Sequence, residues 1–274
     1  MPMRPERSIS IIKGMGRALI TGASAGLGKE FAQQLAREGN DLVLVARSEQ
    51  LLEELAGELR AEHGVQVEVL PADLSLVRDV QGVSKRLRDT DSPITLLVNN
   101  AGGGLGQDFL TGTVRTERAA EAVMVTAVLV LSHAAAKAMV ARGRGTIINV
   151  GSITAMTVQG TYSAHKAWVK TFTEGLAADL QGTGVNATVV LPGLMHTEFH
   201  ERANVDSSQW PQWAFVSKRA VVTAALDAAR RRQVLVVPGV LYKAAYHVLK
   251  VAPRVLIRRF GGPQLSGRSA GIPE

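Results

Sequence analysis

The feature that most constrains the fold is a regular alternation of short apolar runs with longer amphipathic stretches. Amphipathic stretches with helical spacing, such as Leu51–Ala61 and Leu76–Leu87, lie between runs that are rich in Val, Ile and Leu, as strands buried on both faces require. The runs are Ala18–Ile20, Asp41–Ala46, Val65–Leu70, Ile94–Val98, Thr146–Val150, Val185–Leu191 and Val234–Val237. Such alternation predicts an α/β fold, a doubly wound parallel sheet of about seven strands flanked by helices.

The length of the chain fits one large α/β domain. Its 274 residues are 46% hydrophobic and 20% charged, which is a globular composition. We predict an N-terminal extension over residues 1–14, a Rossmann-type catalytic domain over 15–238, and a basic C-terminal extension over 239–274. The extension would pack on the domain or at an interface.

Several classes of site and location are excluded or disfavoured by composition. The chain has no cysteine, so disulfides, thiolate nucleophiles and thiolate metal sites are excluded. Its histidines lack metal-ligand spacing, and we predict no metal. Residues 1–13 are polar and lack the apolar core of a secretory signal, and no uninterrupted apolar run reaches the ~18–20 residues of a spanning helix. These features predict a cytoplasmic protein.

Three motifs occupy the carboxyl ends of predicted strands, where doubly wound sheets bind ligands. The glycine-rich turn Thr21–Gly28 precedes a helical pattern at Leu27, Phe31 and Leu35, and such a turn lets a pyrophosphate reach a helix N-terminus. Asn99–Gly102 follows a later strand, and Ser152 follows another.

A fourth motif is the pair Tyr162 and Lys166, which lie four residues apart and therefore on one face of a helix. A fixed ammonium stabilises a phenolate, so this spacing predicts that the pKa of Tyr162 is lowered toward the range of an acid–base catalyst.

Together the motifs resemble the short-chain dehydrogenase/reductase family, in the branch with a Thr-Gly-x-x-x-Gly-x-Gly turn and a Tyr-x-x-x-Lys pair. The resemblance extends over roughly residues 15 to 200. It implies that Tyr162 donates a proton to the developing alkoxide, that Lys166 holds the nicotinamide ribose, and that Ser152 hydrogen-bonds the substrate oxygen.

The resemblance also implies a nicotinamide dinucleotide cofactor and the residues that bind it. In addition to Tyr162 and Lys166, these are Thr21, Gly22, Ser24, Ala25, Gly26, Leu27, Gly28, Arg47, Asp73, Leu74, Asn100, Ala101, Gly102, Pro192, Gly193 and Thr197.

The end of the second predicted strand favours NADP(H) over NAD(H). NAD-binding relatives usually place a carboxylate there for the ribose hydroxyls, whereas this chain has Ala46 followed by Arg47. A guanidinium binds a 2′-phosphate bidentately, and Ser24 could add a hydrogen bond to the same phosphate. Asp73 could contact the adenine or cap the next helix.

Two departures from the family pattern qualify the assignment. Met124 stands where relatives usually have an asparagine that organises a water-linked proton relay, and a thioether cannot donate a hydrogen bond. Ser152 precedes Tyr162 by ten residues, a shorter interval than in most relatives, which reshapes the substrate pocket.

The leading hypothesis is an NADP(H)-dependent oxidoreductase that reduces a ketone or aldehyde, or oxidises the matching alcohol, of a lipophilic small molecule. The proposed apolar lining is Leu105, Phe109, Met156, Val158, Leu194, Trp210 and Trp213. The alternatives are a catalytically weak NADP(H)-binding sensor and, less favoured, a sugar-nucleotide epimerase or dehydratase. The resemblance implies a homodimer or homotetramer through the helices that contain Met124 and Tyr162.

Two segments extend beyond these motifs. Val205–Phe215 is predicted to be a loop or short helix that acts as a substrate lid or packs its tryptophans on the body. Residues 218–274 hold eleven Lys and Arg against two acids, but no nucleic-acid motif accompanies this charge.

Within the basic segment, one helical face carries the apolar residues Leu241, Ala244, Ala245, Val248 and Ala252. Packing on the body or on a second subunit is favoured for this segment. Contact with an anionic membrane is the less favoured alternative.

Overall fold

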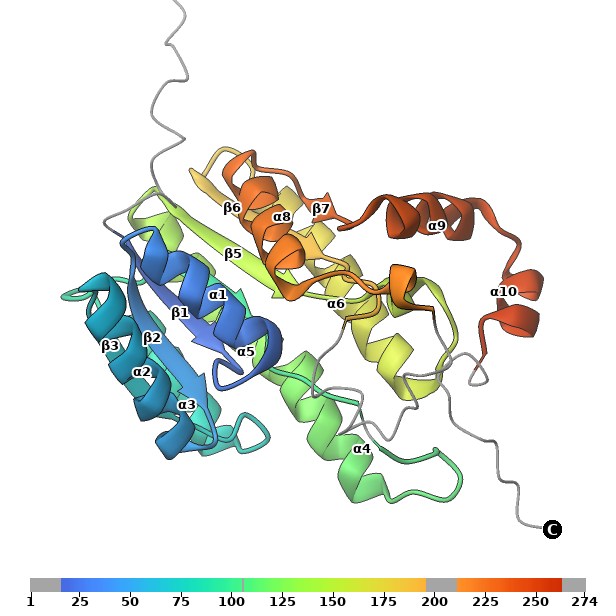
Figure 1. The fold of residues 1–274 in the computed structure, drawn as a ribbon, viewed down its shortest axis with the longest axis horizontal. Helices are drawn as coiled ribbons and strands as arrows, with labels where there is room; N and C mark the ends of the chain where they lie inside the picture. The colour runs from blue at the N-terminus through green and yellow to red at the C-terminus, as the bar shows by residue number, and fades with distance from the viewer. Residues whose placement is uncertain (1–15, 105, 196–210, 263–274) are drawn as a thin grey trace, which may run out of the picture.

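A parallel sheet of seven strands lies at the centre of the molecule, in a computed structural model that describes residues 16–104, 106–195 and 211–262 (Figure 1). The strands are β1 (Arg17–Thr21), β2 (Asp41–Ala46), β3 (Val67–Pro71), β4 (Leu96–Asn99), β5 (Gly145–Val150), β6 (Val185–Val190) and β7 (Leu235–Val236). Their order is β3-β2-β1-β4-β5-β6-β7, and every pair is parallel. The predicted doubly wound α/β fold is confirmed.

Helices cover both faces of the sheet and build a core on each side. The helices of the main body are α1 (Gly26–Arg37), α2 (Glu49–His63), α3 (Val77–Leu87), α5 (Ala127–Ala141), α6 (Gly160–Asp179) and α8 (Lys218–Arg230). Leu27, Phe31 and Leu35 of α1 are buried together with residues of α2 and α8 on one face. Helices α3, α5 and α6 bury the other face, so the molecule has three layers.

The observed strand limits differ from the predicted ones by one or two residues at every strand except β2, and β1 and β5 are each longer than the predicted runs. β3 begins at Val67 rather than Val65, β4 runs from Leu96 to Asn99 rather than from Ile94 to Val98, and β6 ends one residue early, at Val190. β7 has only two residues. Ile94 is 1% exposed although it precedes β4, so an apolar pattern reports burial and does not by itself report pairing between strands.

One long helix contains a break in its hydrogen-bond pattern. α4 (Val114–Glu121) continues through a π-helical turn, η1 (Ala122–Thr126), into α5. The continuous helix Val114–Ala141 has the length and hydropathy of a membrane span, but half of its apolar window is buried within the molecule. Core helices of ordinary domains have the same properties, and this helix covers the sheet as such a helix does.

The chain ends in two helices, α9 (Val240–Val251) and α10 (Arg254–Phe260), at the side of the sheet where β6 and β7 lie (Figure 1). The buried face of α9 consists of Tyr242 and Tyr246, and it is not the predicted aliphatic face, on which Leu241 and Val248 are exposed. A tyrosine ring buries more area than an alanine or valine, and the Tyr242 hydroxyl finds an acceptor at the carbonyl of Ala214, 2.7 Å away.

Several predicted features fall outside the described residues. These are the 1–14 extension, Leu105, Thr197, residues 205–210 of the predicted loop, and residues 263–274. The rest of that loop contains a short 3-10 helix, η4 (Gln212–Ala214), in which Trp213 is 74% exposed and Ala214 is buried.

Candidate active site

The glycine-rich turn is fixed to the end of β4, where the winding of the sheet changes direction. The hydroxyl of Thr21 accepts hydrogen bonds from the backbone N–H groups of Asn100 and Ala101, at 2.9 and 3.0 Å. The Asn100 side chain donates in return to the carbonyls of Thr21 and Gly22. These contacts place the turn and the Asn-Asn-Ala-Gly segment side by side at a topological switch point, the usual ligand site of such sheets.

The shape of this turn suits a diphosphate. A side chain at Gly28 would overlap the Gly22 carbonyl oxygen, so glycine is required for α1 to begin this close to β1. At Gly26, by contrast, the space where a side chain would stand is open. The N-cap residue Ala25 offers no side-chain acceptor, so the first N–H groups of α1 have no cap. Open space beside uncapped N–H groups is what a pyrophosphate requires.

The end of β2 lies beside the same turn. The N–H of Ala23 donates to the Val45 carbonyl at 3.2 Å, which fixes the turn two residues before Arg47. Arg47 is exposed and forms no ion pair with the described residues, whereas the neighbouring Ser48 caps α2. A free guanidinium next to the phosphate turn, with Ser24 half-buried in it, fits the predicted contact with a 2′-phosphate.

Asp73 and Leu74 follow β3 at the same edge of the sheet. The Asp73 carboxylate accepts hydrogen bonds from the N–H and the hydroxyl of Ser75, at 2.9 and 2.7 Å. It therefore stabilises the turn before α3 and does not cap that helix, whose N-cap is Leu76. Leu74 is buried in the core.

The three predicted catalytic residues meet at the end of β5. Ser152 is the N-cap of a 3-10 helix, η2 (Ile153–Met156), while Tyr162 and Lys166 lie in the first turns of α6. The Ser152 hydroxyl hydrogen-bonds to the Tyr162 phenol. The Lys166 Nζ donates to the Val150 carbonyl at 2.8 Å and lies 5.7 Å from the centroid of the Tyr162 ring. A carbonyl oxygen placed between the two hydroxyls would meet a proton donor and a second hydrogen-bond donor.

Burial shifts the pKa values of Tyr162 and Lys166 in opposite directions. It raises the pKa of the Tyr162 phenol well above its ordinary value, and the hydrogen bond from Ser152 opposes that rise only in part. Burial also lowers the pKa of Lys166 from 10.5 to about 8. The predicted lowering of the Tyr162 pKa is wrong in this geometry, because desolvation of the phenol outweighs the ammonium, which is directed at Val150.

A buried polar ladder beneath the catalytic residues was missed from the sequence. Asn99 of β4 donates to Asn149 of β5 at 2.9 Å and to Ser132 of α5 at 3.0 Å, and Asn149 donates to Thr173 of α6 at 2.9 Å. The ladder fixes α6 against the two strands whose ends form the site. An asparagine inside the apolar run Thr146–Val150 was the signal that could have revealed it.

The Pro-Gly turn after β6 closes the other side of the site. The Pro192 carbonyl accepts from the N–H of Ile153, next to Ser152, at 2.9 Å, and the Leu194 carbonyl accepts from Val216 at 2.8 Å. A side chain at Gly193 would overlap the Tyr242 ring, so α9 packs directly under this turn. This role of Tyr242 was also missed, although tyrosines at 242 and 246 share one helical face.

Met124 lies beside the catalytic lysine. A side-chain carbon placed at Gly102 would stand 3.3 Å from the Met124 Cγ and 3.7 Å from the Lys166 Nζ, so the three residues are neighbours. The methionine is buried in the π-helical turn η1, at the position where the family resemblance implies an asparagine. Burial lowers the pKa of the adjacent His165, while Glu117 and Glu121 oppose that shift.

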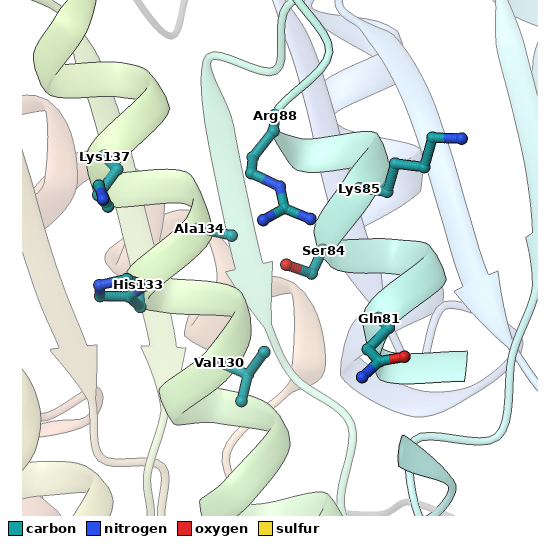
Figure 2. Close-up of a pocket in the computed structure, with 8 residues that line it drawn as sticks. All are labelled: Gln81, Ser84, Lys85, Arg88, Val130, His133, Ala134 and Lys137. Atoms are coloured by element: carbon teal, nitrogen blue, oxygen red, sulfur yellow. The ribbon is translucent and has the colours of Figure 1, made fainter. Parts of the chain in front are cut away.

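A surface groove between α3 and α5 lies apart from this site (Figure 2). Ser84 and Arg88 of α3 face Val130 and Ala134 of α5 across it, and Lys85 points away from α5. None of the residues that line it belongs to the predicted catalytic or cofactor-binding set. The predicted site residues lie instead at the carboxyl edge of the sheet.

Comparisons with known proteins identify the family to which this chain is similar. Residues 17–208 match the family described as short chain dehydrogenase. A solved short-chain dehydrogenase from Sphingobium yanoikuyae in complex with NADPH is similar to 95% of this chain and 99% of its own, with 33% identity and a TM-score of 0.79. The bulky-bulky ketone specific alcohol dehydrogenase from Comamonas testosteroni is 29% identical, with a TM-score of 0.75 over 88% of this chain and 96% of its own. Sulfoacetaldehyde reductase 2 from Chromohalobacter salexigens is 36% identical over 66% of this chain and 73% of that protein.

Proposed function

This chain belongs to the short-chain dehydrogenase/reductase family, and from that premise we propose that it is an NADP(H)-dependent reductase of a lipophilic ketone or aldehyde, or a dehydrogenase of the matching alcohol. Membership of the family makes it an oxidoreductase that acts on keto and alcohol groups. The cofactor preference, the substrate class and a cytoplasmic location are the parts that we propose.

The meeting of Ser152, Tyr162 and Lys166 at the end of β5 is the observation that carries the proposal. When bound, the nicotinamide supplies or accepts a hydride. In the reductive direction the Tyr162 hydroxyl gives its proton to the substrate oxygen, and Ser152 donates a hydrogen bond to that oxygen as charge develops. Burial lowers the pKa of Lys166 to about 8, which makes its ammonium a stronger acid, and its Nζ lies 5.7 Å from the centroid of the Tyr162 ring, a position from which it could help to return a proton to the tyrosine.

Two observations support NADP(H). Arg47 is an exposed cation at the end of β2 with no ion pair to the described residues, and Ala46 leaves no carboxylate to repel a phosphate. The similar protein from Sphingobium yanoikuyae was solved in complex with NADPH. The residues that would hold the adenosine phosphate are Ser24 and Arg47, and the first turn of α1 would hold the diphosphate.

The substrate class is supported by apolar residues around the site. Ile153, Met156 and Leu194 are partly buried in one apolar cluster next to the Ser152 loop and the Pro-Gly turn. Phe109 and Trp213 are large exposed hydrophobic residues on the loops that follow β4 and β6. The similar enzyme from Comamonas testosteroni acts on bulky ketones, which is consistent with a pocket of this kind.

A second candidate is a catalytically weak NADP(H)-binding sensor of the same fold. The buried Met124 beside Lys166 favours it, because a thioether cannot pass a proton along a hydrogen-bonded chain. The sensor predicts tight NADPH binding without consumption, whereas the reductase predicts both.

Cofactor titration together with a carbonyl panel tests these alternatives. We expect NADPH to bind more tightly than NADH, and Arg47→Ala to weaken NADPH alone by roughly ten- to 150-fold, the value of a charged hydrogen bond of about 1.5–3 kcal/mol. Arg88→Ala, an exposed arginine on α3, is the matched control and should change neither constant. Equal dissociation constants for NADPH and NADH would contradict the cofactor assignment. NADPH binding without consumption of any ketone or aldehyde would favour the sensor.

A further inference from the structure

The last two described helices carry an apolar surface that faces away from the protein. Val240 is 87% exposed and Val251 is 80% exposed, and both lie on the side of α9 opposite Tyr242 and Tyr246. α10 adds further aliphatic and aromatic side chains. We call this surface the outer face; its members are Val240, Val248, Val251, Val255, Leu256 and Phe260. Exposed apolar side chains grouped on two consecutive helices in this way are typical of an interaction site.

The outer face cannot turn inward, because the opposite side is fixed to the body. Tyr242 donates to the Ala214 carbonyl at 2.7 Å and packs under Gly193, and Tyr246 and Ile257 are buried. Beyond α10, the Gly261 carbonyl accepts from the N–H of Val158 at 3.1 Å. Each helix is therefore held by one side, and the valines of the other side are displayed toward solvent.

The two helices that carry the outer face contain basic residues and no acidic residue. Between Gly239 and Gly262 the chain has five Lys and Arg, one His, and no Asp or Glu. Lys243 and Lys250 lie between the apolar and buried sides of α9, and α10 contributes Arg254, Arg258 and Arg259. None of these five forms an ion pair with a described residue.

The outer face could be covered by a second copy of the chain or by a lipid surface, and the positive charge of these two helices favours the lipid surface. In a two-fold contact with a second copy, the face would meet itself and bring five cations against five cations. An anionic lipid surface complements both properties, since apolar side chains enter the headgroup boundary while flanking lysines and arginines stay among the phosphates. We propose that the outer face of α9 and α10 docks the protein on an anionic lipid bilayer.

Docking by this face would bring the substrate loops to within one helix diameter, ~10 Å, of the lipid, because the Pro192–Leu194 turn lies on the other side of α9. α9 supports the Pro192–Leu194 turn through Gly193, and the residue after α10 bonds to Val158 in the loop between Ser152 and Tyr162. A lipophilic substrate could then pass from the bilayer into the site, a consequence that rests on the proposed function. The docking itself does not rest on it.

Sedimentation of the full-length protein with lipid vesicles tests the docking. We expect binding to vesicles that mix phosphatidylcholine with phosphatidylglycerol to exceed binding to pure phosphatidylcholine by on the order of tenfold or more, and to weaken with salt. The apolar double variant Val248→Asp with Val251→Asp and the charge variant Lys250→Glu with Arg254→Glu should each remove most of it. Every substituted side chain is exposed, so the fold should be retained.

Control variants on α3 test whether the loss of vesicle binding is specific to the outer face. Leu76→Asp with Val77→Asp introduces the same two charges at exposed apolar residues, and Lys85→Glu with Arg88→Glu makes the same charge change as the charge variant at a distance from the outer face. Both should bind vesicles as the unchanged protein does. If the controls lost vesicle binding to the same extent, net charge alone would explain the loss, and the proposal would be overturned.

Two further results would overturn it. One is an unchanged protein that stays in solution with anionic vesicles at low salt. The other is an unchanged protein that does not bind vesicles and that forms a dimer or larger oligomer by light scattering. In that case the apolar double variant should be a smaller species than the unchanged protein. That result would assign the outer face to a second copy. The readout uses no substrate, so an inactive protein that binds vesicles would contradict the proposed function and leave the docking supported.

Discussion

In most proteins charged side chains are exposed and large aliphatic side chains are buried. Helix α6 departs from the first half of this pattern, and helix α9 departs from the second half. α6 places the charged Lys166 at 5% exposure inside the protein, and α9 places Val240 and Val251 in solvent. Buried charges and exposed clusters of large aliphatic residues both cost stability. Each arrangement therefore indicates that something other than stability keeps the residues there.

The two helices differ in whether the chain supplies the missing partner. Lys166 has the Val150 carbonyl at 2.8 Å, and the Asn99–Asn149–Thr173 ladder holds the helix around it. The valines of α9 have no partner among the described residues. The catalytic end of α6 is thus arranged by this chain, whereas nothing among the described residues covers the valines of α9, for which we propose a surface from outside the chain.

The largest expected effect removes the proton donor from α6. Tyr162→Phe deletes one hydroxyl, and because general acid–base catalysis contributes ~10²–10⁴-fold, turnover should fall by that amount. The NADPH dissociation constant, measured by fluorescence titration, should change little. Ser163→Ala, a buried hydroxyl in the same turn, serves as the control for local packing. A Tyr162→Phe protein with unchanged turnover would remove this residue from the mechanism.

The second prediction measures the cost of the buried ammonium. Folding lowers the pKa of Lys166 from 10.5 to about 8, so the unfolded chain binds more protons between these values, and stability from this group rises with pH across that range. Below about pH 8 the buried ammonium is fully charged and lowers the free energy of unfolding by its full amount. Lys166→Met should therefore stabilise the protein near pH ~7 by on the order of 1–3 kcal/mol, after the loss of the bond to Val150 is included.

Urea unfolding of the Lys166→Met variant and the unchanged protein measures this difference. The advantage of the variant should shrink as pH rises from about 8 toward 10.5, because the unfolded lysine then also loses its proton. A variant that is less stable at every pH would show that the Val150 carbonyl fully offsets the burial of the charge.

The same contrast explains what the sequence could and could not predict. Alternating apolar runs were sufficient for the parallel sheet, and the spacing of Tyr162 and Lys166 was sufficient to place both on one helix beside Ser152. Those features depend on local periodicity and on the ends of strands. The strand limits at Val65 and Ile94 were wrong because apolar residues also pack outside the ladder: Ile94 is buried and Val65 is partly buried.

Properties that arise from tertiary surroundings were not predicted. The pKa of Tyr162 depends on how deeply the ring is buried, which spacing does not report. The side of α9 that packs on the body was not predicted, because aliphatic periodicity drew attention to Leu241 and Val248, while the contact uses a tyrosine that fits Gly193 and reaches Ala214. The burial of Asn149 was not predicted because its hydrogen-bond partners, Thr173 and Asn99, lie 24 and 50 residues away in the sequence.

The smallest expected effect is on α9, and it tests whether that face is free in solution. Val251 is 80% exposed, so Val251→Ala should change the free energy of unfolding by no more than about 0.5 kcal/mol. Val43→Ala makes the same substitution at a valine with 0% exposure in β2, and it should cost roughly 2 kcal/mol. Both are measured by urea unfolding without lipid. If Val251→Ala costs as much as Val43→Ala, and the cost depends on protein concentration, the outer face is already covered by a second copy. A cost near zero leaves the valines of α9 available to a surface that the chain does not itself provide.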